Sequence, residues 1–136
     1  MGGCMAVDEA QQTRGLGLIL LSGDYTRVHF GFSLAAGAAA LGRSVVVFAS
    51  AGACPALMRD WSALEGSSRD EDTCAKGVAG LEELRDALSL FDIPMILCEA
   101  GLKMADLMPD DVLPGVRIGG IAGFLEASHG CQIVSI

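Results

Sequence analysis

Cys98 is the residue whose type and position point most directly to chemistry in this 136-residue chain. It ends the apolar run 93–97 and precedes the segment 99–107, a pattern that predicts a short buried strand followed at once by a helix. The dipole and free N–H groups at a helix start stabilise an anion such as a thiolate. A nucleophilic thiol is therefore expected at Cys98, and a buried structural cysteine is the alternative.

Glu99 is the residue that complicates this expectation. Its carboxylate stands next to Cys98 in the sequence and opposes ionisation of the thiol unless it turns away. Lys103 follows four positions later, so an ion pair along one helix face could turn the carboxylate away from the sulfur. We place Glu99 in the predicted pocket.

Three more pocket residues are expected after the first apolar run, because ligands of parallel sheets bind outside the carboxyl ends of the strands. Gly23 and Asp24 follow that run directly, and His29 lies about one helical turn further on. A histidine at this place could hold a thiolate or deliver a proton. A solvated His29 without a role in the site is the preferred alternative.

Composition limits the classes of partner. The net charge of −8 argues against nucleic acid and against an anionic membrane surface. We expect no targeting segment in residues 1–12, which lack basic residues, and no membrane span, because no apolar run is long enough. Its five cysteines include no CxxC pair, which fits a reducing cytoplasm better than a disulfide framework. No dinucleotide, Walker or zinc pattern is present, so neither a cofactor nor a metal is expected.

The order of apolar runs and helical patterns predicts an α/β protein, a three-layer α/β/α sandwich with a mainly parallel five-stranded sheet. Residues 1–14 are expected to form a flexible N-terminal tail and residues 15–136 a single domain. Residues 65–77, rich in Gly, Ser and charge, are expected to form a mobile loop that contains Cys74. The expected strands are 16–21, 45–48, 93–97, 116–119 and 132–136, and the expected helices are 26–41, 54–64, 79–91, 99–107 and 121–128.

The predicted helix 79–91 is clearly amphipathic. Leucines 81, 84 and 88 together with Phe91 are expected to face the core, while Glu82, Glu83, Arg85 and Asp86 are expected to face solvent.

Residues 93–107 resemble the cysteine segment of the DsrE/DsrF-like family of small sulfur-carrier proteins, which includes TusD. Residues 18–24, 113–120 and 123–125 are similar to the first and last βα units of that family. The resemblance implies an α/β/α fold with a five-stranded sheet, homo- or hetero-oligomers, and a cysteine that carries sulfane sulfur as a persulfide. That role would fall on Cys98.

Cys54 is the second candidate catalytic thiol, expected at a helix start on the same edge of the sheet, next to Pro55. Residues 54–59 are one residue short of the Cys-x5-Arg loop that binds phosphate or sulfur groups. Cys54 would serve as a resolving thiol or second sulfur acceptor. A small residue at a helix start is the alternative interpretation.

The sequence therefore predicts a sulfur carrier or sulfurtransferase that holds a persulfide on Cys98 and passes it to a thiol of a partner protein, in a homo-oligomer. Two alternatives remain open. One is a non-catalytic oligomeric subunit that binds a small ligand or serves assembly. The other is a thiol redox sensor that pairs Cys98 with Cys54 or Cys74.

Overall fold

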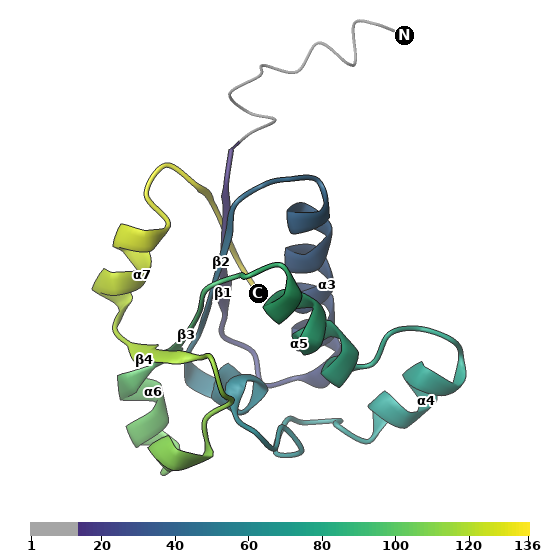
Figure 1. Ribbon diagram of the computed structural model, residues 1–136. Coiled ribbons are helices and arrows are strands. Elements are labelled where there is room, and N and C mark those ends of the chain that lie inside the picture. The colour runs from purple at the N-terminus through teal and green to yellow at the C-terminus, as the bar shows by residue number, and fades with distance from the viewer. Residues whose placement is uncertain (1–13) are drawn as a thin grey trace, which may run out of the picture.

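A five-stranded sheet with helices on both faces forms the body of the protein (Figure 1). The computed structural model describes residues 14–136, so the predicted tail up to residue 13, with Cys4, lies outside the described residues. The sheet order is β4-β3-β2-β1-β5, and every pair of neighbouring strands is parallel. The predicted fold class is confirmed. The strands are β1 (Leu16–Leu20), β2 (Val45–Ala49), β3 (Met95–Cys98), β4 (Arg117–Gly119) and β5 (Gln132–Ser135).

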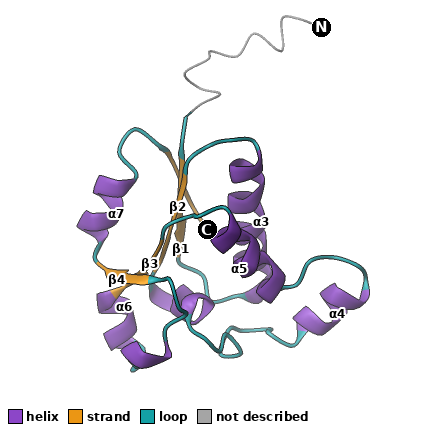
Figure 2. Cartoon of the chain, in the orientation of Figure 1, coloured by secondary structure: helices purple, strands orange, loops and turns teal. Residues whose placement is uncertain are grey.

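The helices divide unequally between the two faces (Figure 2). Helices α3 and α5 pack together over one face, α7 covers part of the other, and α6 lies where the strands end. The helical elements are α3 (Tyr25–Ala40), the 3-10 helix η1 (Ala51–Leu57), α4 (Arg69–Ala75), α5 (Leu81–Leu90), α6 (Glu99–Met104), the 3-10 helix η2 (Pro109–Asp111) and α7 (Ile121–Ala127). Within residues 14–136, no helix has the length and apolar character needed to cross a lipid bilayer.

Strand alternation separates two hydrophobic cores. Leu18, Val47 and Leu97 are fully buried and belong to the large core beneath α3 and α5. The intervening residues point to the opposite face, where Phe48 and three further residues form a small core against α7. Cys98 follows Leu97, so it belongs to the second face and packs against this small core.

The segment after β2 corrects the predicted helix 54–64. A short 3-10 helix, η1, ends at Leu57, and Met58 is already extended and forms a bridge with Val112. The carbonyl groups of Ala56, Met58 and Arg59 accept hydrogen bonds from the Arg85 side chain. The Arg85 side chain thus satisfies carbonyl groups that lack helical N–H partners where the segment leaves helical geometry.

The predicted mobile loop 65–77 is also corrected, because it contains helix α4. The Asp70 carboxylate on α4 accepts a 2.6 Å hydrogen bond from the Tyr25 hydroxyl and a 2.8 Å bond from the backbone N–H of Leu81. Burial, followed by the hydrogen bond to Asp70, raises the pKa of Tyr25 to about 12. These contacts tie a polar segment to α3 and α5, which its composition alone does not indicate.

Helix α5 differs from its predicted pattern at two positions. Arg85, expected to face solvent, is only 3% exposed. Its guanidinium group lies against the end of η1, and Glu82 pairs with it at 3.1 Å. Phe91, expected in the core, is the C-terminal cap of α5 and is substantially exposed. The helix therefore buries an arginine because three backbone carbonyls need a donor there.

Replacing Arg85 by Met should lower the free energy of unfolding by about 2–4 kcal/mol, because the buried carbonyl groups lose their donor while the apolar stem is kept. Arg27→Met, at an exposed position of α3, should change it by no more than about 0.5 kcal/mol. Urea unfolding followed by circular dichroism measures both values. Equal effects of the two substitutions would contradict the assigned role of Arg85.

Candidate functional site

Cys98 stands at the junction of β3 and α6, as the strand–cysteine–helix pattern predicts. It is the last residue of β3 and the N-cap of α6, with extended backbone angles (φ −61°, ψ 120°). The Gly101 backbone N–H donates to its Sγ atom across 3.3 Å. The side chain is half-buried, so the sulfur is held in place while it stays within reach of a reactant.

A cavity of about 710 Å³ opens beside Cys98. It lies on the α7 face, between the carboxyl ends of the three central strands and the first turns of α6 and α7. Its walls are largely apolar, and its volume is typical of sites that hold small organic molecules. The lining residues are Ile19, Leu21, Phe48, Ser50, Cys98, Glu99, Ala100, Lys103, Gly120 and Ile121.

Two charged side chains, Glu99 and Lys103, border this cavity. They form the expected ion pair along α6, with 3.2 Å between Lys103 Nζ and Glu99 Oε1. Both side chains are exposed, so the pair lies at the mouth of the cavity. Of the four predicted pocket residues, Glu99 is the one that lines the cavity with Cys98.

Cys54 lies close to Cys98 but is fully buried. It is inside η1 rather than at a helix start, which corrects the predicted position. A Cβ atom added to Gly101 would lie 2.7 Å from Cys54 Sγ and 3.5 Å from Cys98 Cβ, so both cysteines border the same glycine. Burial, and then the neighbouring Cys98, raise the pKa of Cys54 to about 11. The structure thus places a shielded, protonated thiol beneath an accessible one.

Gly23 and Asp24 make structural contacts and are not among the residues that line the cavity. Gly23 approaches η1 so closely that an added Cβ would lie 2.6 Å from the Gly52 carbonyl oxygen. Asp24 caps helix α3, accepting a bond from the backbone N–H of Arg27. Its carboxylate also lies 3.5 Å from the Arg69 guanidinium. Neither residue lines the cavity that contains Cys98.

His29 belongs to the opposite side of the sheet. Its Nε2 atom lies 2.7 Å from the Ala79 carbonyl oxygen, which requires that nitrogen to be the donor. The ring also lies 5.7 Å from the Tyr25 ring. His29 therefore joins α3 to the segment before α5 and is not brought together with Cys98.

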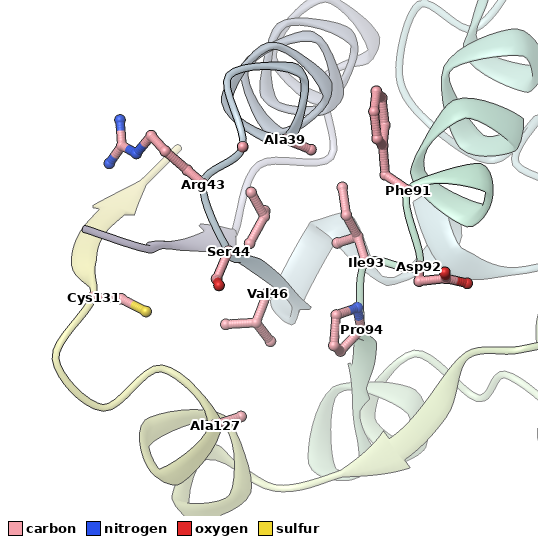
Figure 3. Close-up of a pocket in the computed structure, with 12 residues that line it drawn as sticks. Ala39, Arg43, Ser44, Val46, Phe91, Asp92, Ile93, Pro94, Ala127 and Cys131 are labelled. Carbon is pink, nitrogen blue, oxygen red and sulfur yellow. The ribbon is translucent and has the colours of Figure 1, made fainter. Parts of the chain in front are cut away.

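The two remaining described cysteines lie elsewhere. Cys74 is exposed on α4. Cys131 precedes β5 and borders a separate cavity of about 450 Å³ at the amino ends of the strands, with Ser44 and Val46 nearby (Figure 3). Across residues 14–136, no three His, Cys, Asp or Glu side chains gather as metal ligands would.

The apolar walls of the Cys98 cavity were not predicted, although strand parity contains a signal for them. Ile19 pairs with Phe48, and Phe48 pairs with Ile96, so these three residues form one row across the second face. Cys98 stands two residues beyond Ile96 on the same face. Alternate residues of the expected strands 16–21 and 45–48, counted back from Leu21 and Phe48, include both Ile19 and Phe48.

Iodoacetamide at neutral pH should modify Cys98 in the folded protein at least about tenfold faster than Cys54, because alkylation needs an accessible thiolate. Peptide mass spectrometry after timed quenching measures both rates. In urea the two rates should converge, which serves as the control. Modification of native Cys54 as fast as Cys98 would contradict the burial described above.

The raised pKa of Cys54 also predicts a dependence of stability on pH. The unfolded thiol loses its proton near the ordinary value of 9.0, and the folded thiol only at about 11. Its contribution to stability is therefore intact below pH 9 and is lost as pH rises towards 11. Cys54→Ala should show a shallower fall in unfolding free energy over this range, measured by urea titration, with neutral-pH data giving the packing cost alone. Identical slopes in parent and variant would contradict the shift.

Comparison with curated proteins gives a sequence match over part of the chain. No protein-family model matches the chain. The sulfur carrier protein DsrE2 of Allochromatium vinosum is 35% identical over 52 residues, which are 38% of this chain. The matched segment spans 33% of the length of DsrE2.

Two solved structures share the fold over nearly all of the described chain. The ychN protein of E. coli aligns with a TM-score of 0.61 and 13% identity, covering 90% of this chain and 99% of that one. MTH1491 of Methanobacterium thermoautotrophicum, described as a protein of unknown function, aligns with a TM-score of 0.57 and 19% identity over the same shares. At such identities the likeness shows the fold alone. The expected resemblance to the DsrE/DsrF-like family is therefore supported by a local match to DsrE2, and the shared α/β fold agrees with it.

Proposed function

We propose that this protein is a sulfur carrier in which Cys98 accepts sulfane sulfur as a persulfide and passes it to a thiol of a partner protein. The observation that carries the proposal is the position of Cys98: half-buried, held by the Gly101 N–H, and open to a cavity of about 710 Å³. The local match to a sulfur carrier protein supports the same chemistry.

The transfer needs the thiolate of Cys98 and a donor with a sulfur–sulfur bond. The thiolate attacks the outer sulfur of the donor, a new bond forms to Cys98 Sγ, and the donor's own S–S bond breaks. The electron pair of that bond leaves with the inner sulfur as a thiolate. An acceptor thiolate then attacks the outer sulfur of the Cys98 persulfide and releases the Cys98 thiolate. No external oxidant or reductant is required, because each step exchanges one S–S bond for another.

Cys54 supports this role as a packing residue rather than as a second carrier. Its sulfur is fully buried against Gly101 and its pKa is raised to about 11. A thiol that stays protonated and covered reacts slowly with the persulfide of its neighbour. The persulfide would therefore persist long enough to meet an acceptor.

Binding of a small ligand without catalysis is the second candidate function. The favouring observation is the same cavity, whose walls are mostly apolar and which would hold a small organic molecule whether or not Cys98 reacts. Assembly into a homo-oligomer is part of both proposals.

The parent protein, reduced and then exposed to a persulfide donor, should gain the mass of one sulfur atom that dithiothreitol removes. Cys98→Ser should take up none, because the attacking sulfur is gone. Cys74→Ser and Cys131→Ser are matched controls that should retain uptake, since both residues lie away from the cavity. Intact-protein mass spectrometry gives the result. Uptake by Cys98→Ser equal to that of the parent would reject the sulfur-carrier proposal and leave small-ligand binding.

A further inference from the structure

We propose that the cavity beside Cys98 selects sulfane-sulfur donors whose carrier group is apolar and uncharged, namely small organic hydropersulfides, over anionic donors such as thiosulfate. This inference rests on the proposed function of Cys98 and specifies its substrate class.

The apolar walls of the cavity favour an apolar donor. Ile19, Leu21, Phe48 and Ile121 surround the space next to the sulfur. Leu21 and Ile121 are 47% and 52% exposed, so a bound apolar group would remove additional hydrocarbon surface from water. That gain is proportional to the apolar area covered. An ionised group placed against the same walls would lose water without gaining a partner.

The charges at the cavity disfavour an anionic donor. Lys103 is the cation that borders the cavity, and its ammonium group is already paired with the Glu99 carboxylate at 3.2 Å. An anion entering the cavity therefore meets a neutral pair instead of a free positive charge. The net charge of −8 adds a repulsion that an incoming anion feels at longer range.

The size of the cavity favours an organic donor. Its volume of about 710 Å³ exceeds what an isolated sulfur atom or an inorganic anion needs and is in the range of organic ligand sites. A donor R–S–SH could place its group R against the apolar walls and its outer sulfur at Cys98. The thiolate of Cys98 then forms a bond to the outer sulfur, which keeps its hydrogen, and R–S⁻ leaves with the electron pair of the broken S–S bond.

The experiment compares two donors with the same reacting group, benzyl hydropersulfide and 4-carboxybenzyl hydropersulfide. They differ by one remote carboxylate, so their intrinsic sulfur chemistry is closely matched. The rate of persulfide formation on Cys98 is followed by quenched-flow mass spectrometry. We expect the parent to react roughly tenfold faster with the uncharged donor, the ratio expected if the unpaired carboxylate weakens donor binding by about 1.4 kcal/mol.

Charge variants test whether the cavity itself causes this preference. Ile121→Lys, or Leu21→Lys on the other wall, places a free cation in the lining and should bring the two rates to within about twofold. Leu125→Lys is the matched control. It lies one turn further along α7, is similarly exposed at 56%, and does not line the cavity. It changes the net charge by the same amount and should preserve the ratio of the parent.

The outcomes separate this inference from the proposed function. Equal rates with both donors in the parent, or an equal change of the ratio in Ile121→Lys and Leu125→Lys, would overturn the assigned donor class while leaving Cys98 a sulfur acceptor. Formation of no persulfide with either donor would overturn both proposals. Thermal unfolding of each variant confirms that the rates come from folded protein.

Discussion

The close contact between Gly101 and η1 is the constraint on which the position of Cys98 depends. A Cβ atom at residue 101 would lie 2.7 Å from Cys54 Sγ and 3.2 Å from the Ala51 backbone nitrogen, so α6 can rest on η1 only with glycine there. The N–H of the same glycine donates to Cys98 Sγ. Arg85 in turn binds the carbonyl groups at the end of η1. The Cys98 thiol is thus held through a chain of contacts that begins on α5.

Unequal covering of the two sheet faces explains why this thiol is reachable. The face beneath α3 and α5 is filled by a large core, in which Leu97 is fully buried. The opposite face is covered by α7, a helix of 7 residues in which Phe124 is the buried residue. Cys98 follows Leu97 and so belongs to the thinly covered face. The cavity beside it is the space that this short helix leaves open at the ends of the strands.

The elements that the sequence predicted well are those in which local pattern and burial agree. Aliphatic runs located the three buried central strands, and the run 93–97 placed Cys98 at its strand end. The failures are segments stabilised by distant partners. Helix α4 depends on Asp70 contacts with Tyr25 and Leu81, and η1 ends where Arg85 takes its carbonyl groups. Local composition does not indicate such distant contacts. The sequence therefore predicted a loop where the polar helix α4 lies, and an exposed side chain where Arg85 is buried.

The candidate site was likewise predicted only in part from the sequence. Position at the end of a strand identifies the edge of the sheet, and Gly23, Asp24, Cys54 and Cys98 do all lie near that edge. Residues at this edge can lie on either face of the sheet, however, and their closeness in sequence does not predict which face. Cys98, Phe48 and Ile19 are brought together because each occupies the same parity in its own strand and the strands pair in register. Gly23, Asp24 and His29 follow a strand whose connection leads to α3, on the other side. In a parallel sheet, the position of a residue along its strand predicts which end of the sheet it lies at. Whether its number is odd or even within the strand predicts which face its side chain occupies. Both are needed before side chains can be assigned to one pocket.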